Sequence, residues 1–174
     1  MKVVLETERL LLREFIISDA ISFYELNSDK EVMKYTGDIP FKNVEEAQCF
    51  LENYKDYTKN GFGRWAVICK DTNTFIGWCG LKRNEENLVD IGFRFFKNFW
   101  NKGYATEAAK ACLYYGFNSL GLKEIIGRAS IENVASIRVL EKLEMKQWKK
   151  GIFEGVDKAV YYIIDKSSSI NNYS

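Results

Sequence analysis

A short loop containing lysine and glycine runs directly into an amphipathic helix in the second half of the chain, and this junction constrains the fold most strongly. From Ala105 to Phe117, small and apolar residues recur at helical spacing, so one face of a helix would be buried. The residues of 88–96, just upstream, favour a strand. The first turn of a helix offers free backbone N–H groups and a positive dipole end, which suit a phosphate. The sequence therefore predicts a strand, an anion-binding loop and a helix, a unit typical of proteins that bind phosphorylated cofactors.

The remaining patterns supply the elements that would surround this unit. Strand patterns predict seven strands in all, over residues 9–17, 64–70, 74–81, 88–96, 124–130, 146–153 and 156–164. Helical patterns predict four helices, over residues 18–26, 43–54, 104–119 and 133–143. Ser18 and Asp19 offer an N-cap, and Asn43 with Glu46 has the spacing of a capping box. Strands and helices in this order predict a mixed sheet covered by helices.

Length and charge limit the possible partners. The chain has 174 residues, enough for one domain with its own core. Its 25 Lys and Arg residues against 24 Asp and Glu residues leave a net charge of +1, without the long basic run that follows nucleic-acid phosphates. The charged N-terminal segment is unlike a signal peptide or a membrane span. We expect a cytoplasmic monomer or homodimer, with neither nucleic acid nor a membrane as direct partner, and a disordered polar tail over residues 166–174.

The sequence contains no histidine, and this narrows the possible chemistry. It excludes Ser-His and Cys-His nucleophile pairs, His-ligated zinc and an imidazole base. The cysteines have no C-x-x-C spacing and are interpreted as reduced packing residues: Cys49, Cys69, Cys79 and Cys112. We expect no bound metal, and proton transfer by carboxylates, hydroxyls, lysines or water.

The loop Trp100–Ala105 fits R/Q-x-x-G-x-G/A, the pyrophosphate-loop pattern of the GNAT acetyltransferase superfamily, at Gly103 and at its final alanine. Trp100 stands at the Arg/Gln position, and a tight packed turn would explain the pattern equally well. Further segments follow in the order of the superfamily, namely Thr7–Arg13, Gly63–Val67, Ile76–Leu81, Asp90–Phe93 and Glu132–Leu143. Over residues 7–165, the chain resembles the Rim-type (RimJ/RimL-like) branch, which acetylates protein N-termini and related amines.

The resemblance implies a single-domain α+β fold over residues 7–165, with a mixed, mostly antiparallel seven-stranded sheet, about four helices, and strands that splay where acetyl-CoA binds. It implies an acetyl-CoA-dependent N-acetyltransferase in which a primary amine attacks the thioester directly, without a covalent enzyme intermediate. The pyrophosphate would rest on backbone N–H groups of the loop, and the pantetheine arm would pair with the strand edge. The cofactor-binding residues expected on this basis are Phe95, Trp100, Asn101, Lys102, Gly103, Tyr104, Ala105, Thr106, Asn133, Ser136 and Arg138.

The same resemblance indicates an acid for the departing thiolate. Ser136 stands where the Rim-type pattern places a proton or hydrogen-bond donor, whereas the tyrosine used by many other members is replaced by Leu140. Asn133 would cap the helix and also reach the cofactor arm.

The sequence constrains the identity of the general base less than that of the acid. Asp157 matches an acidic position in the last hairpin, and Asp90 and Glu154 are rivals near the expected cleft. A carboxylate in a hairpin is more often a turn or ion-pair residue. Catalysis would otherwise rest on placing the two substrates together, with backbone N–H groups holding the oxyanion.

The acceptor is left open by the sequence. Tyr35 and Phe41 lie on a polar loop and are predicted to line the acceptor site, whereas Trp65 and Trp78 are interpreted mainly as core residues. A non-catalytic acetyl-CoA sensor remains an alternative, as does an acetyltransferase that acts on charged tRNA, although the latter should carry basic patches.

Glu144 departs from the family pattern, which has glycine after the last predicted helix. Glycine there adopts a left-handed conformation that glutamate reaches only at a cost in free energy. We expect a local difference at this helix exit.

Overall fold

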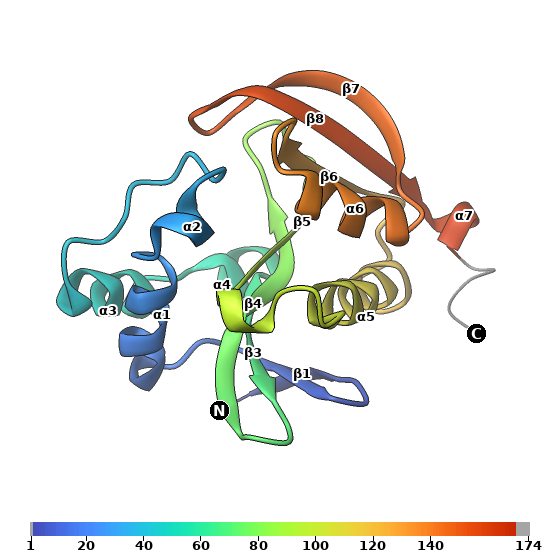
Figure 1. The fold of residues 1–174 in the computed structure, drawn as a ribbon. Coiled ribbons are helices and arrows are strands. Elements are labelled where there is room, and N and C mark those ends of the chain that lie inside the picture. Colours follow the sequence, from blue (N-terminus) through green and yellow to red (C-terminus); the bar gives the residue numbers. More distant parts are fainter. Residues whose placement is uncertain (1, 170–174) are drawn as a thin grey trace.

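The computed structural model describes residues 2–169, which form one mixed sheet covered by helices (Figure 1). Within these residues the sheet has eight strands in the order β1-β2-β3-β4-β5-β6-β8-β7. The strands are β1 Val3–Glu6, β2 Leu10–Arg13, β3 Arg64–Cys69, β4 Thr74–Arg83, β5 Val89–Phe95, β6 Glu124–Ser130, β7 Lys146–Phe153 and β8 Val156–Asp165. Every neighbouring pair is antiparallel except β5 and β6. The α+β fold predicted from the sequence is confirmed, with one strand more than the seven expected.

The additional strand is β1. It has four residues and no buried side chain, so its pattern is too short and too exposed to stand out in the sequence. It forms because it pairs with β2. The strand predicted over 9–17 is confirmed for Leu10–Arg13 only, since the chain then turns into a 3-10 turn, η1.

The helices are α1 Ala20–Leu26, α2 Lys30–Met33, α3 Val44–Glu52, α4 Asp56–Asn60, α5 Tyr104–Asn118, α6 Val134–Lys142 and α7 Lys166–Ser169, with 3-10 turns η1 Ile17–Asp19 and η2 Lys97–Phe99. The four predicted helices correspond to α1, α3, α5 and α6. The other three have four or five residues each, too few for a hydrophobic period. Within the described part of the chain, no helix is both long and apolar enough to cross a membrane.

Helix α7 occupies the start of the tail that we predicted to be disordered. Its first residue, Lys166, donates its backbone N–H to the carbonyl of Lys123 at 3.0 Å, which extends the pairing of β8 with β6 by one residue. Residues 170–174 of the predicted tail lie outside the described residues.

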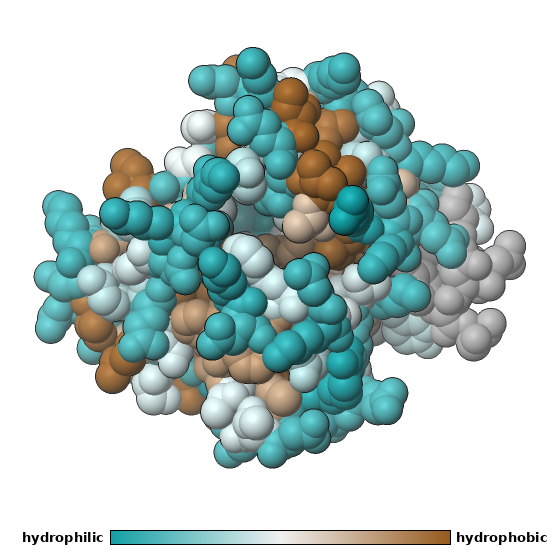
Figure 2. All heavy atoms as spheres, viewed as in Figure 1, coloured by the Kyte–Doolittle hydropathy of each residue, from teal (hydrophilic) through white to brown (hydrophobic). Residues whose placement is uncertain are grey.

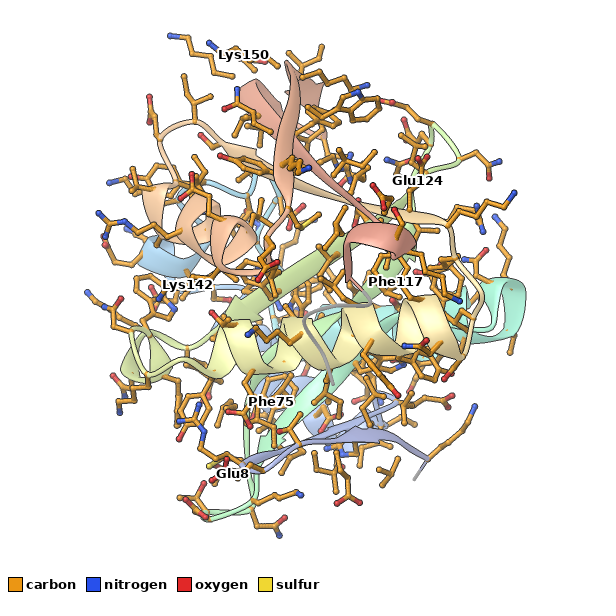
Figure 3. All side chains as sticks on the ribbon, turned by 90° about the vertical axis from the view of Figure 1, so that its right-hand side faces the viewer. Glu8, Phe75, Phe117, Glu124, Lys142 and Lys150 are labelled. Carbon is orange, nitrogen blue, oxygen red and sulfur yellow. The ribbon has the colours of Figure 1, made fainter. Side chains whose placement is uncertain are left out.

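The described residues form three hydrophobic clusters, and two of them lie beneath helices that cover opposite faces of the sheet (Figures 1 and 3). The larger one is covered by α5, whose predicted apolar face is buried: Ala108, Ala109, Cys112, Leu113 and Phe117. The smaller one lies under α1 and α3. Helix α5 is thereby fixed against β4 and β5, and its N-terminus lies beyond the end of β5.

The sheet splays between β5 and β6. These strands pair only at Asp90 with Ile126 and at Ile91 with Gly127. Beyond this point, residues 92–95 of β5 still pair with β4, while residues 128–130 of β6 pair with β8. One edge of β5 is therefore left without a neighbouring strand, and the sheet is divided into two parts, β1–β5 and β6-β8-β7. We call this boundary the seam.

The predicted caps of α1 and α3 have different outcomes. Asn43 caps α3, because its Oδ1 accepts the N–H of Glu46 at 2.9 Å. Asp19 does not cap α1. Its carboxylate accepts the backbone N–H of Ile16 at 2.9 Å and forms a buried bidentate ion pair with Arg13 at 2.6 and 2.7 Å. The charged guanidinium of Arg13 is a stronger partner for the carboxylate than the backbone N–H groups of α1.

The exit of α6 has the left-handed conformation that glycine favours. Glu144 has a φ of +61°, in the left-handed region, and its N–H donates to the carbonyl of Glu141 at 2.9 Å. The N–H of Met145 then bonds to the carbonyl of Leu140 at 3.2 Å, which closes the helix end. The local difference that we expected is absent. The rest of the fold compensates for the free-energy cost of a glutamate in the left-handed conformation.

Candidate active site

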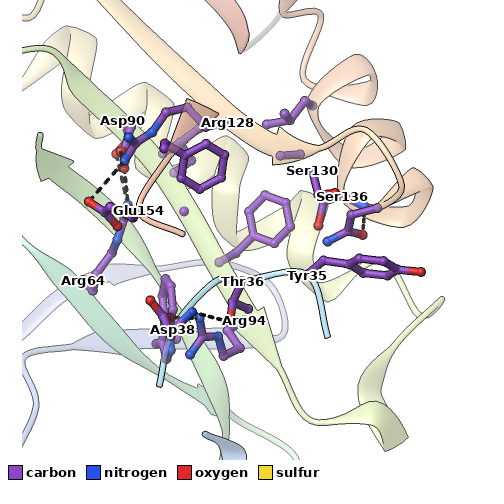
Figure 4. Close-up of a pocket in the computed structure, with 18 residues that line it drawn as sticks. Tyr35, Thr36, Asp38, Arg64, Asp90, Arg94, Arg128, Ser130, Ser136 and Glu154 are labelled. Carbon is purple, nitrogen blue, oxygen red and sulfur yellow. Dashed lines mark hydrogen bonds and ion pairs between the residues drawn. The ribbon is translucent and has the colours of Figure 1, made fainter. Parts of the chain in front are cut away.

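A pocket opens at the seam, where β5 and β6 diverge (Figure 4). Its walls come from the segment after α2, from β3, β4, β5 and β6, from the start of α6, and from the turn between β7 and β8. Figure 2 shows that this face of the molecule is hollowed near its centre and that hydrophilic residues surround much of the hollow. The pocket therefore collects side chains from both parts of the sheet.

The loop before α5 has the backbone geometry expected of an anion site. Asn101 and Gly103 have φ values of +59° and +83°, and Gly103 directly precedes the first turn of α5. Trp100 donates its indole N–H to the carbonyl of Phe95 at 2.8 Å, so it ties the loop to the end of β5. The N–H groups of the first helical turn face outward from the helix end without intrahelical acceptors. Lys102 is exposed, with its Nζ 5.6 Å from the ring centre of Phe99.

A bracing cluster of Thr7, Arg9 and Glu107 holds this loop against the N-terminal part of the sheet. Glu107 accepts hydrogen bonds from the Thr7 hydroxyl at 2.6 Å and from the Arg9 backbone N–H at 3.1 Å. It also forms an ion pair with the Arg9 guanidinium at 2.5 Å. Arg9 in turn donates to the carbonyl of Lys102 at 3.1 Å. The sequence offered no sign of this cluster, because Glu107 lies about a hundred residues from Thr7 and Arg9.

The bracing cluster makes the loop sensitive to acid. Burial alone would raise the pKa of Glu107, but the bonds from Thr7 and Arg9 outweigh it and hold the pKa below the ordinary value of 4.5. Its stabilising effect is therefore complete above pH 4.5 and is lost as the pH falls through the lowered pKa.

We expect Glu107→Gln to reduce the free energy of unfolding by about 1 kcal/mol at pH 7, because the charge-assisted bonds become neutral ones. At a pH low enough to protonate the wild-type carboxyl, below its lowered pKa, the two proteins should be about equally stable. Urea unfolding at both pH values measures this difference, with Glu124→Gln on the exposed side of β6 as control. An equal loss of stability at both pH values would contradict the assignment.

Asn133 and Ser136 lie together at the start of α6 and both line the pocket. The Oδ1 of Asn133 accepts the backbone N–H of Ser136 at 3.1 Å, so the predicted N-cap is confirmed. The hydroxyl of Ser136 is directed to the pocket side of the helix (Figure 4). Arg138 is exposed on the same helix and is not among the pocket residues.

Asp90 is buried at the seam between two arginines. Its side chain is 2% exposed, and its two carboxylate oxygens accept from Arg64 on β3 and Arg128 on β6. Burial alone would lower the pKa of Arg64, but the charge of Asp90 reverses the direction, and the pKa is raised. This triad joins the two parts of the sheet across the seam.

Arg94 forms a second charged group in the pocket. Its guanidinium donates to the side-chain oxygen of Asn27 and to the carboxylate of Asp38, the latter at 2.5 Å. Burial lowers the pKa of Arg94, and the contact with Asp38 only partly opposes this. The Trp78 ring lies 5.2 Å from the Arg94 guanidinium, so this tryptophan is a pocket wall as well as a packing residue.

The other predicted site residues are placed as follows. Tyr35 and Glu154 line the pocket. Asp157 is exposed on β8 and is not among the lining residues. Phe41 is not there either, because its ring packs between Phe23 and Phe50, with centroids 5.7 Å from each, in the cluster under α1 and α3. Trp65 is fully buried in the core, as interpreted from the sequence.

Sequence reasoning missed the three pocket arginines, Arg64, Arg94 and Arg128. Arg64 begins the otherwise apolar strand β3, Arg94 stands between two phenylalanines on β5, and Arg128 lies among small and apolar residues on β6. Because charged side chains are rarely buried without a partner or a function, that pattern is the signal that could have revealed them. Sequence reasoning also missed the exposure of Cys49, since only the other three cysteines are buried.

The open strand edge, the glycine loop and the adjoining pocket together form the arrangement of an enzyme that takes an acyl group from coenzyme A. The chain belongs to the GNAT acetyltransferase family, because the family described as "Acetyltransferase (GNAT) domain" matches residues 9–146. It is an acetyl-CoA-dependent N-acetyltransferase.

Relatives of known sequence or structure agree with this assignment. The uncharacterized N-acetyltransferase p20 of Bacillus licheniformis is 35% identical over 164 residues, which span 92% of this chain and 91% of that protein. A GNAT-family acetyltransferase from Bacillus anthracis has a crystal structure similar to this one, with a TM-score of 0.79, 33% identity, and coverage of 96% and 99% of the two chains. The spermidine N-acetyltransferase of Vibrio cholerae, solved with CoA and spermine, gives a TM-score of 0.79 over 95% and 100% of the chains. At 20% identity, that likeness shows the fold alone.

Proposed function

We propose that this enzyme transfers the acetyl group of acetyl-CoA directly to a primary amine while both substrates are bound at the seam. The observation that carries the proposal is the unpaired edge of β5 over residues 92–95, which leads from the loop before α5 to the pocket. The pantetheine amides can pair with this edge as a short added strand. We take residues 7–165 as the catalytic domain and, on the motifs of the sequence, the Rim-type branch as its place in the family.

The loop fits the pyrophosphate of the donor. Residues 101–106 would supply backbone N–H groups, and the dipole of the 15-residue helix α5 would lie behind them. The nearest atom to a Cβ built on Gly103 is an Arg9 nitrogen at 3.4 Å, so the surface above the glycine is open to a ligand. The charge of Arg9 beside the loop is paired with Glu107, so the exposed Lys102 and Arg138 are the cations proposed for the phosphates of the donor.

The pocket supports a reaction of the following form. The neutral amine attacks the thioester carbonyl carbon, a C–N bond forms, and the C–S bond breaks with the electron pair leaving on sulfur. The Ser136 hydroxyl, directly or through water, would protonate the thiolate and regain a proton from the attacking nitrogen, which loses it as the amide forms. Free N–H groups of the β5 edge would hold the oxyanion. Removal of the ammonium proton falls to Glu154 or to water, since both oxygens of Asp90 are held by guanidinium groups. Asp157, outside the pocket lining, would act only through an intervening water.

Two measurements test the proposal. Titration calorimetry should show one acetyl-CoA site per chain, and a thiol-release assay over peptide N-termini and small amines should show acceptor-dependent CoA formation. Intact mass measured during turnover should show no acetylated enzyme intermediate. Binding without CoA release over the whole panel would instead indicate the sensor alternative, and release only with aminoacyl-tRNA would indicate the tRNA alternative.

Ser136→Ala tests the acid. We expect kcat to fall by about a hundredfold, because general acid catalysis is lost, while the Kd for acetyl-CoA changes by less than about threefold. Ser136→Cys keeps a proton donor and should recover part of the rate. Unchanged turnover in Ser136→Ala would remove this residue from the mechanism.

A further inference from the structure

The interior of the pocket carries more positive than negative charge. Three guanidinium groups line it, and the side chains of Arg64, Arg94 and Arg128 are 15%, 11% and 11% exposed. Among the described residues of the lining, Asp90 is the one carboxylate buried as deeply, at 2% exposure. Asp38 and Glu154 stand at the rim, with 45% and 46% of their side chains exposed, so water screens them. The deep part of the pocket is therefore suited to an anionic group.

Arg128 has hydrogen-bond donors that its neighbours leave unused among the described residues. Among the described residues, its guanidinium donates from Nη2 to Asp90, and the same nitrogen lies 3.8 Å from Glu154. Its Nε and Nη1 make no such bond within residues 2–169, and its guanidinium carbon lies 4.7 Å from the ring centre of Phe153. Arg64, by contrast, is committed to Asp90 and to the carbonyl of Gly80. Arg128 is thus the guanidinium that can accept a further partner.

Arg94 adds a second, partly compensated positive charge to the pocket. Figure 4 shows Arg64, Asp90, Arg128 and Glu154 grouped at one end, Arg94 and Asp38 at another, and Ser136 across from them. The anionic partner of Arg94 is the exposed carboxylate of Asp38, so its charge is only partly compensated. A planar carboxylate can accept two parallel bonds from one guanidinium.

We propose that the acceptor carries a carboxylate beside its primary amine, as a free amino acid does, and that Arg128 binds this carboxylate with Arg94 supporting it through its charge. This inference rests on the proposed function and names its acceptor class. A polyamine would bring further positive charge into a pocket that already has an excess. The arginines would also disfavour the ammonium form of the bound acceptor, which leaves more of the reactive free amine.

Matched acceptors test the inference. The thiol-release assay would compare α-, β- and γ-amino acids with their carboxamides and with spermidine, using the wild-type enzyme. We expect the best amino acid to have a kcat/KM at least about tenfold above that of its own amide, because the amide cannot form the charged pair. A carboxylate of the same shape that lacks the amine should inhibit competitively against the acceptor.

Variants assign the preference to a residue. In Arg128→Gln the ratio of acid to amide should approach one, while the Kd for acetyl-CoA stays within about threefold. Arg83→Gln, on β4 outside this pocket, should keep the wild-type ratio. If Arg128→Gln fails to fold, Arg94→Gln and the inhibition by the amine-free carboxylate carry the test. Preference for amides or spermidine, or an unchanged ratio in Arg128→Gln, would overturn the inference. CoA release that no amine of the panel increases would overturn the proposed function and this inference with it.

Discussion

Gly103→Glu should weaken acetyl-CoA binding by at least about a hundredfold. The substitution places a carboxylate at the N-terminus of α5, where the helix dipole and the free N–H groups would otherwise meet the pyrophosphate. The new side chain would occupy that space and would repel a phosphate of the same sign. Calorimetric titration with acetyl-CoA measures the loss, and the thiol-release assay should show a parallel fall in kcat/KM.

Gly121→Glu is the matched control. Gly121 has a φ of +66°, close to the +83° of Gly103, so glutamate suffers a similar backbone strain of about 1–2 kcal/mol at either position. Neither position is closed to a Cβ, since Gly121 has no atom within 4 Å and Gly103 has only the Arg9 nitrogen at 3.4 Å. Gly121 lies beyond the other end of α5, so its variant should bind acetyl-CoA normally. Equal affinities in the two variants would contradict the placement of the pyrophosphate.

Asp90→Ala should reduce the free energy of unfolding by about 3–5 kcal/mol, because it leaves two buried guanidinium groups facing each other without a carboxylate. The loss is large because it acts on both parts of the sheet: Arg64 comes from β3 and Arg128 from β6. Urea unfolding measures it, and activity should fall with stability. A variant as stable as the wild type would show that the triad does not hold the seam.

Asp157→Ala provides the comparison for Asp90. Its side chain is exposed, so the free energy of unfolding should change by less than about 0.5 kcal/mol. The same variant tests whether Asp157 acts as the base. Because Asp157 lies outside the pocket lining, its replacement should change kcat by less than about threefold. A fall of a hundredfold in a stable Asp157→Ala protein would return Asp157 to the reaction as the base.

Local patterns predicted the elements that are long and periodic, and missed what depends on distant partners. The apolar face of α5 was readable because its buried residues follow one another at helical spacing. The triad of Arg64, Asp90 and Arg128 was not, since its ion pairs join residues 26 and 38 positions apart. No local pattern says which way such side chains turn.

The residues expected at the acceptor site also show what a local sequence pattern can and cannot predict. Tyr35 and Phe41 share one polar loop, yet Tyr35 turns to the pocket and Phe41 turns to the cluster under α1 and α3. The direction of the Phe41 ring is set by partners from other elements, Phe23 on α1 and Phe50 on α3. A loop sequence alone therefore could not separate a substrate contact from a packing residue.

The seam has a consequence for how substrate and folding are linked. With two residue pairs between β5 and β6, neither part of the sheet contains the whole pocket, which exists only after β6, β8 and α6 have docked against the rest. A donor bound along β5 that also contacts α6 would favour the docked form by mass action, by about 2.7 kcal/mol at a concentration a hundredfold above its Kd. Cellular acetyl-CoA would then act as a folding ligand for its own enzyme, and a chain with undocked halves would lack the complete pocket in which donor and acceptor meet.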